Sequence, residues 1–285
     1  MERPNWLNVK NVKESTLIEM KQLLDRFDLH TICENGNCPN VGICFSNKTA
    51  TFMILGEVCT RNCTFCNVES GQPQDPEENE SDKIVEAASL LKLKHIVITS
   101  VTRDDLFDGG AYYFASAIKK IRATLPESTV EVLVPDFKGS MSALQTVLNA
   151  GPDVLGHNLE TVPRLYRIVR QRSDYFRSLR LLKQVKEFNP KILTKSGLML
   201  GLGEKQNEVF EVLEDLRRNQ CDIVTIGQYL QPSSKHATVK EYVHPEVFEA
   251  YLNKANEMGF SYVYSGPFVR SSYMAHEVFL EKVIK

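Results

Sequence analysis

Residues 50–66 read ATFMILGEVCTRNCTFC, an apolar run that passes directly into a loop with three cysteines, Cys59, Cys63 and Cys66. The run predicts a buried strand at residues 50–55. No G-x-G-x-x-G nucleotide fingerprint follows this strand, and a cysteine loop stands in its place. This arrangement favours a (β/α) barrel, partial or complete, over an open dinucleotide-binding sheet.

Similar short apolar runs recur along the chain, and each predicts a further strand. They lie at residues 95–99, 130–134, 154–158, 193–200, 223–229 and 262–265. Between them apolar residues recur at helical spacing, as in Val209, Val212, Leu213 and Leu216. Alternating strands and helices predict an α/β fold with parallel strands. We expect six βα units in a barrel over 50–265, with extensions at 1–49 and 266–285 that close over the barrel mouth.

The composition excludes several classes of protein. The 285 residues include 34 Lys and Arg against 36 Asp and Glu, a formal net charge of −2, with 42% hydrophobic and 25% charged residues. These values indicate an ordinary globular chain and argue against a general nucleic-acid binder or a polybasic membrane surface. No apolar run approaches the roughly 18 residues of a membrane span. The first fifteen residues carry acids and lack a hydrophobic signal region, so we expect a cytoplasmic protein.

Polar residues follow the predicted strands, where active sites of (β/α) barrels lie. Ser100, Asn158 and Glu160 are candidate cofactor-binding residues. The run Arg103-Asp104-Asp105 fits loop salt bridges as well as a site, and the G-x-G at residues 201–203 is interpreted as backbone room near a cofactor. Residues 67–82, with six acids and no base, predict a solvated loop. The six histidines have no ligand spacing and are interpreted as structural.

Six of the seven cysteines lie between Cys33 and Cys66. They form two triplets, Cys33-x4-Cys38-x5-Cys44 and Cys59-x3-Cys63-x2-Cys66, while Cys221 is interpreted as a plain core or helix-end thiol. Without a secretion signal, such clusters indicate metal binding more than disulfides. A structural zinc site needs four ligands, often from two C-x2-C pairs, and neither triplet supplies four ligands or two such pairs. Iron–sulfur clusters match better, and three thiolates per cubane leave one iron open to another ligand.

The second triplet, with Phe65 before its last cysteine, resembles the signature of the radical S-adenosylmethionine superfamily. The resemblance implies that Cys59, Cys63 and Cys66 hold a 4Fe–4S cluster whose open iron binds S-adenosylmethionine. It also implies production of a 5′-deoxyadenosyl radical, with the hard chemistry carried by the cofactor. Phe65 would lie near the adenine, or would simply be a core aromatic residue.

Over nearly its whole length the chain resembles the lipoyl synthase family. Beside the first triplet, matching stretches include HIVITSVTRDDLFDGGA at 95–111, GHNLETVPRLY at 156–166, TKSGLMLGLGE at 194–204 and SGPFVRSSY at 265–273. The resemblance implies a sulfurtransferase that inserts sulfur at C6 and C8 of an octanoyl chain on a carrier lysine. It also implies an auxiliary 4Fe–4S cluster, the sulfur source, held by Cys33, Cys38, Cys44 and Ser272. From the residues alone, Ser271-Ser272 fits a helix N-cap before residues 273–283 equally well.

The same resemblance implies the partners. They are octanoylated lipoyl-carrier domains (2-oxoacid dehydrogenase E2 subunits and the glycine cleavage H protein), a flavodoxin or ferredoxin as electron donor, and iron–sulfur assembly or carrier proteins. Neither nucleic acid nor membrane is expected.

Some positions depart from the family pattern, and two other functions stay open. Ile43, Phe45 and Lys48, beside Cys44, replace a usual glutamate, a common tryptophan and a frequent glycine. The surroundings of the auxiliary cluster are therefore where this chain differs.

One alternative function is that of a radical sulfur-inserting enzyme with another acyl or peptide acceptor. The other is a non-catalytic iron–sulfur carrier, which would need neither a barrel of this size nor an open iron.

Overall fold

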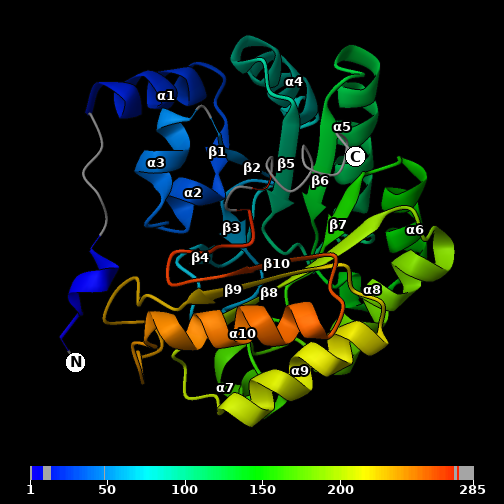
Figure 1. Ribbon diagram of the computed structural model, residues 1–285. Coiled ribbons are helices and arrows are strands. Elements are labelled where there is room, and N and C mark those ends of the chain that lie inside the picture. Colours follow the sequence, from blue (N-terminus) through cyan, green and yellow to red (C-terminus); the bar gives the residue numbers. More distant parts are fainter. Residues whose placement is uncertain (1, 9–13, 48, 273–274, 276–285) are drawn as a thin grey trace. The chain divides into compact units, whose positions relative to one another are not determined.

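The computed structural model describes residues 2–8, 14–47, 49–272 and 275 (Figure 1). The chain forms two compact units. The amino-terminal unit comprises Val9–Arg61, Val68–Val154 and Ser272–Lys285, and the carboxyl-terminal unit comprises Met1–Asn8, Asn62–Asn67 and Leu155–Ser271. The division between them cuts the second cysteine loop between Arg61 and Asn62.

The amino-terminal unit is built around four strands in the order β1-β2-β5-β6. β1 pairs antiparallel with β2, and β2, β5 and β6 run parallel to one another. Its elements are α1 (Glu14–Arg26), β1 (His30–Thr31), α2 (Ile32–Asn35), α3 (Val41–Ser46), β2 (Thr51–Ile54), β3 (Val58–Cys59), β4 (Glu69–Ser70), α4 (Glu80–Leu91), β5 (His95–Ser100), α5 (Ala111–Thr124), β6 (Thr129–Leu133), a 3-10 turn (Phe137–Gly139) and α6 (Met141–Asn149).

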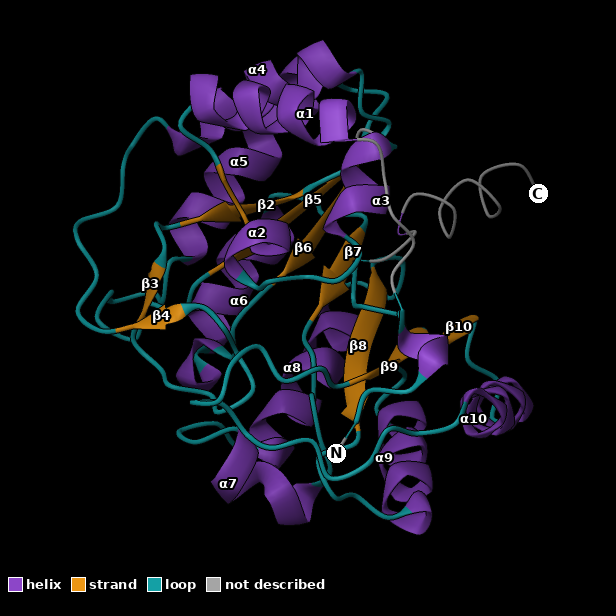
Figure 2. Cartoon of the chain, turned by 90° about the vertical axis from the view of Figure 1, so that its left-hand side faces the viewer, coloured by secondary structure: helices purple, strands orange, loops and turns teal. Residues whose placement is uncertain are grey.

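The helices of this unit bury the faces that their sequences predict. In α4, Ile84, Ala87 and Ala88 are fully buried, and α4 packs against α5, which packs against α6. The side chain of Ser140 caps α6 by accepting a hydrogen bond from Ala143 N. β3 and β4 form a separate two-stranded parallel sheet at the second cysteine loop (Figure 2).

The carboxyl-terminal unit continues the pattern of strands and helices. Strands β8, β9 and β10 run parallel, and α10 packs against β9 and β10 (Figure 1). Its elements are a 3-10 turn (Asn5–Leu7), β7 (Val154–Gly156, whose first residue belongs to the other unit), a second 3-10 turn (Pro163–Leu165), α7 (Tyr166–Val169), α8 (Tyr175–Phe188), β8 (Leu193–Leu200), α9 (Gln206–Arg218), β9 (Ile223–Gln228), α10 (Pro245–Glu257) and β10 (Tyr262–Ser265). The predicted apolar face of α9 is buried.

The sequence prediction of an α/β fold with parallel strands and helical crossovers is confirmed. Within the described residues, all seven predicted strands are present, and six of them are each followed by a helix. Sequence reasoning missed β1, a two-residue antiparallel edge strand, and the small β3–β4 sheet. The three-part division of the chain at residues 49 and 265 stays a prediction.

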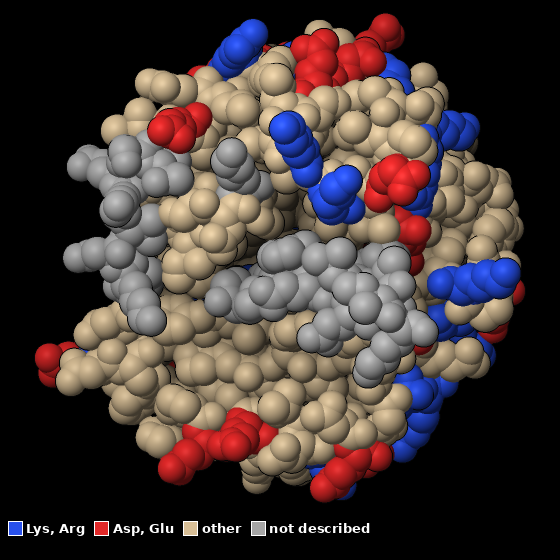
Figure 3. Space-filling model, turned by 45° about the horizontal axis from the view of Figure 1, so that its top comes forward, with Lys and Arg blue, Asp and Glu red and all other residues tan. Residues whose placement is uncertain are grey.

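Two surface properties accompany this fold. None of the helices in the described ranges is long and apolar enough to cross a membrane. On the face drawn in Figure 3, basic and acidic side chains are interspersed, as expected from the near-neutral net charge.

Candidate iron–sulfur and S-adenosylmethionine sites

The first cysteine triplet lies on two short helices and the turn between them. These helices follow β1, which pairs with β2. Cys33 is on α2 and Cys44 on α3, while Cys38 lies in the turn between them and donates its N–H to Cys33 O at 3.0 Å. The charges of Cys33 and Cys38 each act on Cys44, so the three thiols are near neighbours. The triplet that the spacing predicts is therefore brought together by the fold.

Two thiols of this triplet, Cys33 and Cys44, have raised pKa values. Burial raises the pKa of Cys33 to about 11, against the hydrogen bonds that Thr51 donates to it, and burial raises the pKa of Cys44 to about 12. Assembly of a cluster must therefore release protons. Phe45, one of the departures from the family pattern, is 1% exposed and belongs to the core, whereas Lys48 lies outside the described residues.

The first half of the second cysteine loop is fixed within the amino-terminal unit. The Sγ of Cys59 accepts hydrogen bonds from Arg61 N and Thr102 N, each at 3.4 Å. Thr60 N donates to Thr102 O at 2.9 Å, and Thr60 Oγ1 accepts from Asp104 N at 2.9 Å. The loop after β5 thus holds the backbone around Cys59.

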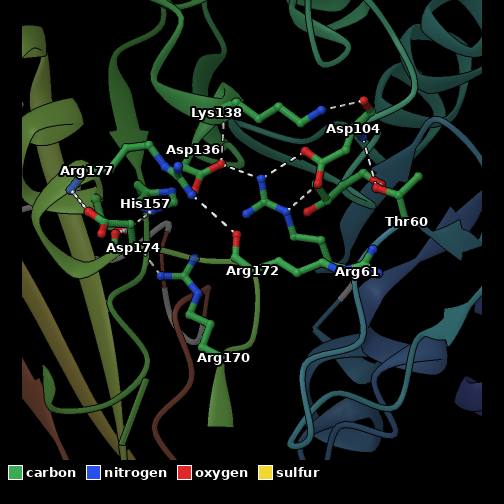
Figure 4. Close-up of polar contacts among 12 residues, drawn as sticks. Thr60, Arg61, Asp104, Asp136, Lys138, His157, Arg170, Arg172, Asp174 and Arg177 are labelled. Carbon is green, nitrogen blue, oxygen red and sulfur yellow. Dashed lines mark hydrogen bonds and ion pairs between the residues drawn. The ribbon is translucent and has the colours of Figure 1, made fainter. Parts of the chain in front are cut away.

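A buried arginine inside this loop ties it to two further strand ends. The Arg61 guanidinium bonds Asp104 at 2.8 and 2.9 Å and Asp136 at 2.7 Å (Figure 4). Burial opposes its charge, but the hydrogen bonds from Arg61 to the two carboxylates keep the pKa of Arg61 above its ordinary value. Arg103, 1% exposed, pairs with Asp105 and donates to Leu55 O at 3.3 Å. Arg103, Asp104 and Asp105 are therefore loop salt bridges.

The acidic stretch of residues 67–82 is not wholly a solvated loop. Its Glu80 begins α4, and the carboxylate accepts hydrogen bonds from Leu55 N at 2.9 Å and Gly56 N at 3.3 Å. Burial raises the pKa of Glu80, and these two N–H groups oppose that rise. Leu55 and Gly56 have φ values of 70° and 80°, so the carboxylate fixes a left-handed turn between β2 and the cysteine loop.

The second half of the loop is held by residues of the carboxyl-terminal unit. Thr64 N donates to Val169 O at 3.0 Å, and Thr64 Oγ1 donates to Ile168 O at 3.2 Å. Ala237 N donates to Thr64 O at 2.8 Å, and His236 Nε2 lies 3.0 Å from Cys66 O. Sequence reasoning treated His236 as only structural and missed its contact with the cysteine loop.

Asn158 and Glu160 lie just past β7, as predicted. The backbone of Glu160 pairs with Gly197 O and Met199 N in β8, and its φ is 68°, a strained value for a residue other than glycine. Burial raises the pKa of Glu160, while Arg170, Asn158 and Arg270 oppose that rise. The charge of Cys63 also acts on Arg170, as that of Glu160 does. Cys63 of the second cysteine loop, Arg170 and Glu160 therefore lie near one another.

These residues fit a polar cofactor. Asn158 Oδ1 and Ser100 Oγ are buried, and neither has a hydrogen-bond partner among the described residues. Buried polar atoms are nearly always paired, so each of these oxygens, within its own unit, is suited to a polar group of a ligand. Gly197 makes room for this arrangement, because a Cβ there would lie 3.0 Å from Asn158 Oδ1. Phe65 is half-buried in the loop.

One other predicted site feature, the G-x-G at residues 201–203, has a local structural role. A Cβ at Gly201 would lie 2.3 Å from Gln228 Nε2 and 2.4 Å from Glu241 O, so the room at this glycine is filled by the chain itself. The interpretation of the G-x-G as space near a cofactor is wrong there. Gln228 is fully buried and donates to Leu200 O, Tyr229 O and Glu241 O, all at 3.0 Å.

The described residues contain no group of three His, Cys, Asp or Glu side chains that converge on a single metal ion. A cubane attaches each cysteine to a different iron, so its ligands surround a cluster instead of meeting at one point. Ser272 belongs to the amino-terminal unit, as the first triplet does. The helix predicted over residues 273–283 lies outside the described residues except at Ala275, which is helical.

Comparisons with known proteins agree with the cysteine pattern. The model of the radical SAM superfamily matches residues 53–216. A lipoyl synthase of Caldicellulosiruptor saccharolyticus is 54% identical over 96% of this chain and 96% of its own length. Another from Caldanaerobacter subterraneus subsp. tengcongensis is 56% identical over 96% of this chain and 95% of its own, and one from Pseudoalteromonas translucida is 50% identical over 100% and 89%.

Solved structures show the same fold at low identity. Methylornithine synthase (PylB) matches with a TM-score of 0.55 and 12% identity, covering 90% of this chain and 79% of its own. Streptococcus suis SuiB, solved with S-adenosylmethionine bound, matches with a TM-score of 0.58 and 11% identity, covering 88% and 60%. These likenesses confirm the predicted fold class.

Proposed function

The chain belongs to the lipoyl synthase family of the radical S-adenosylmethionine superfamily, and we propose that its two cysteine triplets hold two clusters with different roles. The family reaction is the insertion of two sulfur atoms at C6 and C8 of a protein-bound octanoyl-lysine, which gives the lipoyl cofactor. Cys59, Cys63 and Cys66 hold the radical-generating 4Fe–4S cluster. Cys33, Cys38, Cys44 and Ser272 hold the auxiliary cluster.

The observation that carries this proposal is that each triplet lies on a backbone segment with its own anchors. α2 and α3 bring the first triplet together beside β2. Hydrogen bonds with Thr102, Val169 and Ala237 fix the loop of the second. Fixed ligand geometry is what an iron–sulfur cluster needs from its protein.

Family membership implies two 4Fe–4S clusters and S-adenosylmethionine as cofactors. Together they supply a primary carbon radical that removes hydrogen from an unactivated carbon. The chain positions them. Asn158 offers a free acceptor oxygen and Glu160 a carboxylate to an ammonium or hydroxyl group, Ser100 offers a hydroxyl, and Phe65 lies beside the adenine.

Ser272 suits a cluster that must give up sulfur. Thiolates are soft ligands matched to iron–sulfur clusters, whereas an alkoxide is hard. The serine therefore releases its iron more readily than a fourth cysteine would. Its assignment to the same compact unit as Cys33 supports this role.

The partners follow from the reaction. We propose octanoylated E2 domains and the glycine cleavage H protein as substrates, a flavodoxin or ferredoxin as electron donor, and iron–sulfur assembly or carrier proteins to rebuild the auxiliary cluster. A cytoplasmic location fits, because thiolate ligands persist in a reducing compartment.

Two triple variants test the assignment of the triplets. Anaerobically reconstituted protein should contain about eight irons per chain, and each Cys→Ala triple variant about four. The Cys33/Cys38/Cys44 variant should still cleave S-adenosylmethionine to methionine but should not thiolate an octanoyl-lysyl peptide, as followed by mass spectrometry. The Cys59/Cys63/Cys66 variant should lose both activities. Thiolation by the first variant would overturn the auxiliary role, and methionine formation by the second would overturn the radical role.

A further inference from the structure

A short segment of the carboxyl-terminal unit concentrates positive charge in a chain whose net charge is slightly negative. Residues 163–180, PRLYRIVRQRSDYFRSLR, contain six arginines and one acid. Asp174 is used locally, since its side chain caps α8 by accepting from Arg177 N at 2.6 Å (Figure 4). The segment therefore presents a local excess of positive charge.

Two of the arginines are occupied within the fold. Arg164 pairs with Glu208 at 2.6 and 2.8 Å. Arg170 lies over the ring of Tyr166 and bonds its hydroxyl at 3.2 Å. Arg167, Arg172 and Arg180 are exposed, and within the described part of the chain Arg167 and Arg180 form no ion pair.

Large apolar side chains stand among these charges. Ile168 is 63% exposed and Phe176 is 68% exposed. We call the exposed set the arginine surface; it consists of Arg167, Ile168, Arg172, Phe176 and Arg180. Apolar anchors surrounded by a charged rim are the usual composition of a protein interface.

The arginine surface is held rigidly. The rings of Tyr166 and Tyr175 meet edge to face at 5.5 Å, and those of Tyr175 and Phe176 do the same at 5.5 Å. These contacts bring the starts of α7 and α8 together, and Phe176 and Arg180 share one face of α8 because they are four residues apart. A rigid surface loses little entropy when a partner binds.

This surface is joined directly to the loop of the second cysteine triplet. Ile168 O and Val169 O both accept hydrogen bonds from Thr64, the residue after Cys63. The path from Ile168 to a proposed cluster ligand is therefore short. It consists of the hydrogen bond between Ile168 and Thr64 and the peptide link from Thr64 to Cys63. Electron transfer rates fall steeply with distance, so a donor gains from docking here.

We propose that the arginine surface is the docking site of an acidic one-electron carrier protein that reduces the cluster of Cys59, Cys63 and Cys66. This inference rests on the proposed function. The step is a single electron transfer: the donor loses one electron and the cluster gains it, with no proton or bond exchanged at the surface. Complementary charge raises the rate of such encounters and makes them sensitive to salt.

The test uses reduced flavodoxin as the acidic donor and dithionite as a small reductant that needs no docking site. The variant is Arg167→Glu/Arg180→Glu in the full chain with both clusters reconstituted. With flavodoxin at low ionic strength, methionine formation should be about tenfold slower than in the unmodified protein. With dithionite the two proteins should be equally fast. The unmodified protein should also slow with added salt in the flavodoxin assay only.

Matched variants isolate the effect of the surface. Arg167→Lys/Arg180→Lys keeps the charge and should retain the flavodoxin rate. Lys119→Glu reverses an exposed charge on α5, in the other unit, and should have no effect. Iron content and the thermal unfolding midpoint verify that each variant is folded and loaded.

The outcomes separate the inference from the proposed function. Equal flavodoxin rates in the unmodified protein and the charge-reversed variant would overturn docking at this surface. So would a variant that loses only thiolation of octanoylated carrier domains, because the surface would then bind the substrate protein. Absence of methionine formation from the unmodified protein with dithionite would instead refute the radical function itself.

Discussion

Arg61 lies within the second cysteine loop and forms a two-pronged ion pair with Asp104, in the loop after β5, at 2.8 and 2.9 Å. A third bond, at 2.7 Å, reaches the fully buried carboxylate of Asp136 after β6. One guanidinium therefore ties the cysteine loop to the ends of two strands. Arginine suits this position because its planar fork bonds two carboxylates at once.

Replacement of Arg61 by glutamine should destabilise the protein strongly, because it leaves the buried Asp136 without its cation. We expect the free energy of unfolding to fall by about 3 kcal/mol, as for other broken buried ion pairs. Urea unfolding of the cluster-free protein, followed by circular dichroism, measures this change. Arg61→Lys keeps the charge but not the planar fork. Its free energy of unfolding should lie between those of the unmodified protein and of Arg61→Gln. A loss below about 0.5 kcal/mol in Arg61→Gln would contradict the anchoring role.

Glu80 should matter as an acceptor of hydrogen bonds more than as a charge. Glu80→Ala leaves Leu55 N and Gly56 N without their partner and should cost about 2 kcal/mol of unfolding free energy. Glu80→Gln keeps an acceptor oxygen and should cost clearly less. The two variants are compared by urea unfolding at pH 7. Equal losses in both would show that the charge of Glu80, and not its role as an acceptor, stabilises the turn.

Periodic features of the fold could be predicted from the sequence. The strands are continuous apolar runs, and helices such as α9 have a strict apolar face. The pattern of apolar residues is therefore enough to predict them. β1 could not be found in this way, because two residues give no period and its pairing with β2 is non-local. Glu80 was missed for a related reason, since a contact across 25 residues leaves no local pattern.

The candidate site likewise contains features that local sequence predicts and features that depend on contacts between distant residues. Cysteine spacing is a local signal, and the fold brings the first triplet together as the spacing indicates. The anchors of the second triplet, Arg61 and His236, act on residues far away in sequence, so their types alone did not reveal them. Gly197 could have been suspected, because a glycine inside an apolar strand indicates close approach by another group.

The ion pair of Glu208 with Arg164 should make stability depend on acid pH. Hydrogen bonding from Arg164, with help from Lys205 N, lowers the pKa of Glu208 from 4.5 to about 2. Its stabilising contribution is complete above pH 4.5 and is lost as the pH falls toward 2. The Arg164 side chain is half exposed and solvent screens the pair, so we expect less than about 1 kcal/mol.

Urea unfolding of the unmodified protein and Glu208→Gln between pH 7 and pH 3 measures this dependence. The stability difference between them should be constant from pH 7 to 5 and should shrink below pH 4.5. A difference that grows as the pH falls would contradict the assignment. Lys183→Gln, which removes another exposed ion pair at 3.6 Å, provides the control.

His236 should stabilise the cluster loop through a single hydrogen bond. Cys66 O can only accept, so Nε2 of His236 carries a proton, and Nδ1 lies 2.9 Å from Ser233 Oγ. His236→Ala removes the donor and should release iron to a chelator several-fold faster, since the backbone beside a proposed ligand is then held less firmly. His236→Gln can still donate to Cys66 O and should retain iron nearly as well.

The chelator assay needs a background without the first triplet, so that only the cluster of Cys59, Cys63 and Cys66 is counted. In that background we expect the same order of iron retention, with His236→Ala lowest. Thermal unfolding of the cluster-free variants should differ little, because His236 lies in a loop outside the core strands. Equal iron release from His236→Ala and the parent protein would show that Thr64, held by Val169 and Ala237, fixes the loop without the histidine.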